Sequence, residues 1–120
     1  MVILSALIKQ SRKNKPYMHI MPSFYETDKR EGTIQYTAFY YDEYGVCKEV
    51  TDVCEWTVTN RIMDTSFSNY GELTYKCNDD LAKSEQITAR YNGLEVSTVL
   101  FVKAKKEEQD DDTITKLNNN

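Results

Sequence analysis

Histidine is almost absent from this chain of 120 residues. His19 is the only one, so a catalytic group of the Ser/His/Asp or Cys/His kind would have to use it. It stands between Met18 and Ile20 in a stretch that we expect to form a strand, where a structural or surface role is the simpler interpretation. The chain also has no glycine-rich phosphate loop. We therefore expect a protein that is not an enzyme.

Cysteine is scarce too, with Cys47, Cys54 and Cys77. None of their spacings is that of a CxxC zinc-ligand pair, and an odd number leaves at least one thiol free even if one disulfide forms. The acid pairs Asp42-Glu43 and Asp79-Asp80 lack the alternating ligand series of a calcium loop. Aspartate is common in turns because it hydrogen-bonds nearby backbone, and this explains both pairs. We expect neither a metal nor a cofactor.

Long apolar runs are missing as well. No stretch reaches the roughly 18 apolar residues that a membrane-spanning helix needs. The N-terminus is apolar first and basic second, which is the reverse of a secretory signal. Together with the odd cysteine count, this favours a product that folds in a reducing cytoplasm.

Tyrosine, in contrast, is abundant, with nine residues, and β-branched side chains are frequent between positions 32 and 102. Residues of these types favour strands. Residues 33–41 and 86–91 alternate with period two, and residues 53–59 place Trp56 on an apolar face. Shorter strands are expected near residues 17–26, 62–67 and 72–77. The pattern predicts an all-β fold, a β-sandwich of about seven to eight strands.

Turn signals separate these segments. Asn92-Gly93 predicts a two-residue hairpin, because a type I′ turn needs positive φ at both central positions. Pro22 interrupts the first strand, since proline donates no ladder hydrogen bond. Residues 99–102 are apolar on both faces, which predicts cover by another segment, such as residues 1–8, or by another protein.

Charge divides the chain into three parts. Residues 1–15 carry basic side chains and no acid, residues 16–104 form an acidic body, and residues 105–120 form a charged, flexible tail. An acidic body disfavours nucleic acid as the main partner. We interpret residues 1–15 as a docking arm for a protein, with a solvated linker as the alternative. Its candidate binding residues are Val2, Ile3, Leu4, Leu7, Ile8, Lys9, Arg12, Lys13 and Lys15.

From Pro22 to Val102 the chain resembles the bacterial Ig-like group 2 domain family. The resemblance is carried by these residues, in this order: Gly32, Gln35-Tyr36-Thr37-Ala38, Tyr44-Gly45, Glu49-Val50-Thr51, Val53, Trp56, Thr59-Asn60, Ser68-Asn69-Tyr70-Gly71 and Ile87-Thr88-Ala89. It implies an Ig-like sandwich in which Trp56 is the buried anchor between the sheets. The family is a scaffold for adhesion and for virion proteins and has no shared active site.

The resemblance leads to two hypotheses about function. A lone module with free thiols and no signal is typical of an auxiliary protein that decorates a bacteriophage capsid, folds in the host cytoplasm and binds the major capsid protein or another virion protein. The alternative is a bacterial cell-surface module for adhesion or carbohydrate binding. Four tyrosines could then form an aromatic surface for sugars, unless half of them face the core. They are Tyr40, Tyr41, Tyr44 and Tyr70.

Overall fold

Alternation along the strands buries one face of most of them, whereas the short β5 (Cys47–Glu49) is exposed throughout. The computed structural model describes residues 14–59 and 62–106, and every regular element within them is a strand. The pattern is clearest in β9, where Lys83, Glu85, Ile87 and Ala89 are buried. The expected all-β fold is confirmed. The strands are β1 Tyr17–Met21, β2 Phe24–Thr27, β3 Glu31–Gln35, β4 Thr37–Tyr41, β5 Cys47–Glu49, β6 Glu55–Val58, β7 Asp64–Phe67, β8 Glu72–Lys76, β9 Lys83–Tyr91 and β10 Leu94–Val102.

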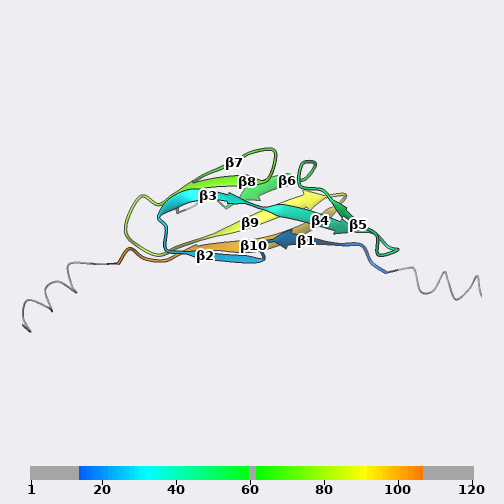
Figure 1. Ribbon diagram of the computed structural model, residues 1–120, viewed down its shortest axis with the longest axis horizontal. Helices are drawn as coiled ribbons and strands as arrows, with labels where there is room; N and C mark the ends of the chain where they lie inside the picture. The colour runs from blue at the N-terminus through cyan, green and yellow to red at the C-terminus, as the bar shows by residue number, and fades with distance from the viewer. Residues whose placement is uncertain (1–13, 60–61, 107–120) are drawn as a thin grey trace, which may run out of the picture.

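The strands lie in two layers that enclose the core (Figure 1). One layer is the four-stranded sheet β2-β10-β9-β6. The other contains the three-stranded sheets β3-β8-β7 and β1-β4-β5, which adjoin because Tyr36 alone separates β3 from β4. Neighbouring strands are antiparallel except β2 and β10, which are parallel. This is the arrangement of a β-sandwich.

Two long segments are divided, so the described residues form more strands than the seven to eight expected. The first segment breaks at Pro22, as predicted, so that β1 pairs with β4 in one layer and β2 with β10 in the other. The segment 33–41 divides at Tyr36, where its partners change from β8 to β1 and β5. The short strand β5 was not expected.

Tyr36, rather than Trp56, is the aromatic residue at the centre of the core. Tyr36 is fully buried, and its ring lies 6.2 Å from the ring of Trp56 and 6.0 Å from that of Phe67. Trp56 is only half-buried, and its indole N–H donates to the carbonyl of Thr51 at 2.9 Å. The sequence predicted that Trp56 is buried between the sheets, but Trp56 is only partly buried and Tyr36 has the buried central position. The reason is that β6 is an edge strand, so its inward side chains are covered on one side only.

The break at Tyr36 is held by the turn between β7 and β8. The Tyr36 N–H donates to the carbonyl of Gly71 at 2.8 Å, and its carbonyl accepts from the Gln35 amide at 2.8 Å. The same amide donates to the Tyr70 carbonyl at 2.7 Å. Gly71 has a φ of 79°, and a Cβ at this position would lie 2.5 Å from the Tyr36 carbonyl oxygen. Only glycine allows this approach.

The Asn92-Gly93 hairpin forms as predicted. Asn92 has a φ of 51° and Gly93 a φ of 78°, which are the two positive angles that a type I′ turn requires. Tyr91 and Leu94 are the pair next to the turn, and pairing continues without interruption to the ends of β9 and β10. This hairpin is the longest pairing in the described residues.

The described chain enters and leaves the sandwich at opposite ends (Figure 1). At one end the Asn14 N–H donates to the Glu43 carbonyl at 2.9 Å. At the other, the Lys105 N–H donates to the Asp80 carbonyl at 2.9 Å. There the Arg30 guanidinium donates to three main-chain carbonyls, which join the exit of the chain to the β8–β9 loop. The three are those of Lys103, Asp79 and Leu81.

Every strand in the described part of the chain lies within the predicted domain 16–104. Most of the docking arm and of the tail predicted for 105–120 fall outside the described residues, as residues 1–13 and 107–120. Within the described residues, no helix is long and apolar enough to cross a membrane.

Substitution of Gly71 by alanine should destabilise the fold much more than the same change at Gly45. Both glycines have positive φ, but a Cβ at Gly45 meets nothing within 4 Å. The left-handed conformation alone costs alanine roughly 1–2 kcal/mol. The clash with the Tyr36 carbonyl should add about 1–3 kcal/mol at Gly71. Urea unfolding of both variants measures the difference, and equal losses would contradict the proposed close approach.

Tyr36→Phe should stabilise the protein. The Tyr36 hydroxyl is buried and has no hydrogen-bond partner among the described residues, and burial raises its pKa far above the ordinary value. Removing an unsatisfied buried polar group should raise the free energy of unfolding by about 1–3 kcal/mol. The free energy of unfolding tests this. A loss of stability would mean that the hydroxyl has a partner after all.

Candidate functional site

The outer face of the β1-β4-β5 sheet carries an unusual set of side chains. Residues directly opposite each other on paired strands share a face, and the register places Tyr41 on β4 between Tyr17 on β1 and Cys47 on β5. It also places His19 opposite Phe39, Met21 opposite Thr37, and Glu49 opposite Phe39. We call this surface the aromatic face. Its residues are Tyr17, His19, Met21, Phe39, Tyr41 and Cys47, with Thr37 and Glu49 at its border.

The aromatic face is accessible to solvent. Tyr17 is 55% and Met21 52% exposed, and His19 and Cys47 are also exposed, whereas the intervening Met18 and Ile20 are buried on the other side of β1. The rings of Tyr17 and Tyr41 stack at 4.5 Å with an angle of 7° between their planes. A hydrogen bond with Cys47 is the largest cause that raises the pKa of Tyr41. The face thus carries one stacked pair of tyrosine rings.

The adjoining half of the same layer has a different outer face. Over β3-β8-β7 the outward side chains are all polar or charged, and Thr33 and Thr74 lie within hydrogen-bond distance at 3.4 Å. Their identities are Glu31, Thr33, Gln35, Asp64, Ser66, Glu72, Thr74 and Lys76. Contiguous exposed apolar patches on a protein surface mark sites of interaction. The contrast within one layer therefore makes the aromatic face the leading candidate site.

A second, smaller apolar group lies on the outer face of the four-stranded sheet. Phe24 is paired with Val99 in the register of β2 and β10, and the two are 57% and 36% exposed. Phe101, two residues further on, is half-buried. The predicted two-faced apolar character of residues 99–102 is confirmed, since Leu100 and Val102 are buried on the inner side. The segment 1–8 proposed to cover it lies outside the described residues.

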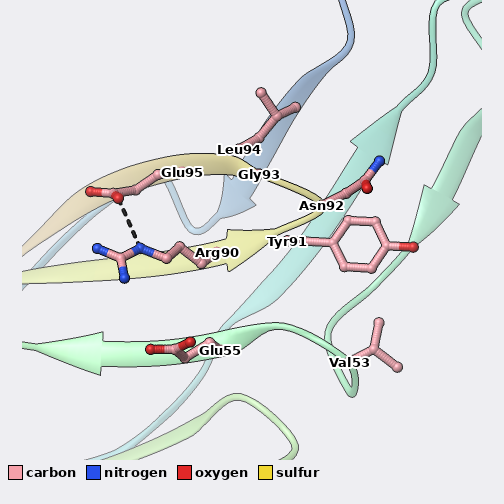
Figure 2. Close-up of a pocket in the computed structure, with 8 residues that line it drawn as sticks. All are labelled: Val53, Glu55, Arg90, Tyr91, Asn92, Gly93, Leu94 and Glu95. Atoms are coloured by element: carbon pink, nitrogen blue, oxygen red, sulfur yellow. Dashed lines mark hydrogen bonds and ion pairs between the residues drawn. The ribbon is translucent and has the colours of Figure 1, made fainter.

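A shallow depression lies beside the β9–β10 hairpin (Figure 2). Arg90 stands between Glu55 and Glu95 on three neighbouring strands and donates to Glu95 at 2.9 Å. This hydrogen bond is the largest cause that raises the pKa of Arg90. Figure 2 shows Tyr91 pointing away from these charges. We interpret the three charged residues as cross-strand pairs that stabilise the sheet.

The predicted docking residues can be located only in part. Lys15 is exposed and directly precedes β1, two residues from Tyr17 in the aromatic face. The other eight residues of the set lie within residues 1–13, outside the described residues. The role of the docking arm therefore stays a prediction.

The four tyrosines proposed as a sugar surface do not share one face. Tyr40 is half-buried on the inner side of β4, packs edge-on against Tyr91 at 5.2 Å and accepts a hydrogen bond from Asn92 at 3.0 Å. Its neighbour Tyr41 points outward, because successive residues of a strand face opposite sides. Tyr44 lies in the β4–β5 turn and Tyr70 in the β7–β8 turn. The alternative that some of them face the core is correct for Tyr40.

The acid pairs act in turns, as predicted. The Asp42 carboxylate accepts from the backbone N–H groups of Tyr44 and Val46, both at 2.9 Å. The Asp79 carboxylate accepts from the Leu81 N–H at 2.9 Å and from Lys83 at 2.8 Å, and the hydrogen bond from Lys83 is the main cause that lowers its pKa. Within the described residues, no group of three or more potential ligands is arranged to hold a metal ion.

Sequence reasoning overlooked Tyr17, Met21 and Phe39 as candidate site residues. A signal was present, because residues 37–41 read Thr-Ala-Phe-Tyr-Tyr and are therefore apolar or aromatic on both faces. The same two-faced pattern was recognised at residues 99–102.

Comparison with known proteins adds no assignment: no family model matches the chain, and no curated protein shows significant similarity to it.

The three free cysteines should differ in reactivity with iodoacetamide. Cys47 is exposed on the aromatic face, whereas burial raises the pKa of Cys54 to about 11. Only the thiolate reacts, so alkylation of folded Cys54 should be slow near neutral pH and should rise about tenfold per pH unit as the pH approaches that pKa from below. Peptide mass spectrometry of timed samples measures each site. Equal rates for Cys54 and Cys47 near neutral pH would contradict the burial of Cys54.

Proposed function

We propose that this protein is a non-enzymatic, Ig-like interaction module that binds a protein partner through its aromatic face. The Ig-like assignment is supported by the order of the strands. In the constant-type Ig fold, strands A, B, E and D form one sheet, and C, F and G form the other. Here the first sheet corresponds to four elements, which are β1, the divided strand β3 with β4, then β8 and β7. The second sheet corresponds to β6, β9 and β10. Strand β2 is then a second part of strand A, parallel to strand G.

The observation that carries the docking function is the contrast between the two halves of one layer. Exposed tyrosine and methionine occupy the outer face of β1-β4-β5, whereas threonine, serine and charged residues occupy that of β3-β8-β7. Tyrosine and methionine are enriched at protein interfaces, because they combine a large contact area with a polar tip or an adaptable chain. A partner that covers this face would remove the exposed rings from water.

We assign this module to an auxiliary protein that decorates a bacteriophage capsid or virion. Three cysteines remain unpaired in the folded chain, which suits folding in the reducing cytoplasm of a host. The acidic body would point outward, and the aromatic face and the docking arm of residues 1–15 would bind the major capsid protein or another virion protein.

The alternative is a module of a cell-surface protein for adhesion or carbohydrate binding. It is favoured by one feature, the entry and exit of the described chain at opposite ends of the sandwich, which suits domains joined end to end. Sequencing the DNA on both sides of the reading frame separates the two settings. Genes for capsid, portal or tail proteins would support the virion, and genes for exported proteins would support the cell surface.

Tyr17→Ser should weaken binding to particles, whereas Phe24→Ser should not. The two side chains are matched, since they are 55% and 57% exposed, but only Tyr17 belongs to the aromatic face. Loss of a central aromatic contact of an interface costs roughly 2 kcal/mol or more, which is about thirtyfold in affinity. Purified variants would be sedimented with particles that lack this protein.

Circular dichroism and thermal unfolding would first establish that both variants keep the fold. Equal binding of the wild type and Tyr17→Ser would overturn the proposed use of this face.

A further inference from the structure

The aromatic face and the N-terminal segment are chemically matched. The face exposes rings and a thioether, and the segment at residues 2–8 contains five large aliphatic side chains and no charge. The five are Val2, Ile3, Leu4, Leu7 and Ile8. Burying both against each other would remove apolar surface from water on two sides at once.

The course of the chain before β1 indicates which molecule supplies the segment. Tyr17 pairs with Tyr41 at the end of β4, and the N–H of Asn14 then donates to the Glu43 carbonyl beyond that end. The described chain before β1 thus extends beyond the end of the β1-β4-β5 sheet (Figure 1). A segment that continued in this direction would lead away from its own molecule, whereas a return to the same face would need a reversal of the chain.

Length and charge fit the same arrangement. Seven extended residues span about 23 Å, whereas the five residues of β4 span about 17 Å, so residues 2–8 can cover the whole face. The next part of the arm carries Lys9, Arg12 and Lys13, and the border of the aromatic face carries Glu49, opposite Phe39. Opposite charges would therefore meet where the segment passes the edge of the face.

We propose that the aromatic face of one copy binds residues 2–8 of a second copy. Donor and acceptor are different surfaces of the molecule, so the contact is head to tail and produces a closed ring or an open chain of subunits. The proposal rests on the proposed function, because it takes the aromatic face as the docking surface and names a second copy of this protein on the particle as the virion protein that the face binds. Neighbouring decorating subunits would be linked in this way.

Sedimentation velocity over a range of protein concentrations tests the proposal with full-length variants. The arm variant is Ile3→Ser with Leu7→Ser, and the face variant is Tyr17→Ser with Met21→Ser. The control variant is Phe24→Ser with Val99→Ser, which changes the exposed apolar residues of the other layer. The wild type and the control should associate as the concentration rises, and the arm and face variants should each associate at least about tenfold more weakly.

Mixing the two weakened variants gives the sharpest result. The arm variant still has an intact face and the face variant an intact arm, so together they should form a one-to-one complex that does not grow further. A second signal comes from Cys47, which lies on the aromatic face and should be alkylated more slowly in the mixture than in the face-intact arm variant alone.

Three results would overturn the proposal. Association of the arm variant as strong as that of the wild type would mean that faces pair with each other. If the wild type is a monomer and its Cys47 is alkylated more slowly than in the arm variant, the segment folds back on its own face.

The wild type could instead be a monomer whose Cys47 is alkylated as fast as in the arm variant. Loss of particle binding in the face variant would then leave the docking function in place and exclude the second copy as the partner. If particle binding also survived in the face variant, the proposed function would fail as well.

Discussion

The exchange of strand partners at Tyr36 is the constraint on which the rest of the structure depends. One continuous segment pairs with β8 before this residue and with β1 and β5 after it, and the ring of Tyr36 is buried where the pairing changes. The unpaired backbone groups at the break are satisfied by Gly71 and by the Gln35 side chain. The close approach of the two backbones is possible because Gly71 has no side chain.

This exchange also separates two outer faces along one segment. Before the break, the outward residues of β3 lie beside the polar rows of β8 and β7. After it, the outward residues of β4 lie between the apolar residues of β1 and the start of β5. The break gathers aromatic side chains from distant parts of the sequence onto one surface.

Much of the fold was predictable because strand periodicity and turn chemistry are local. The alternation at Ile34 and Ala38, the hairpin at Asn92-Gly93 and the interruption at Pro22 all follow from neighbouring residues, and all are present in the structure. The depth of burial was less predictable. Trp56 has the size of a core anchor, but it lies on an edge strand and is only partly buried, so Tyr36 takes the central position.

The candidate site depended on pairing between distant segments. Tyr17 is distant in the sequence from Phe39 and Tyr41, and it meets them only because β1 pairs with β4. By itself, the sequence determined the all-β class, the hairpin and the turn roles of Asp42 and Asp79, because these depend on residues within a few positions of one another. The tertiary structure decided which layer each half of a divided strand joined and which aromatic side chains reached the surface together, because strand pairing across the chain is set by the packing of the whole core.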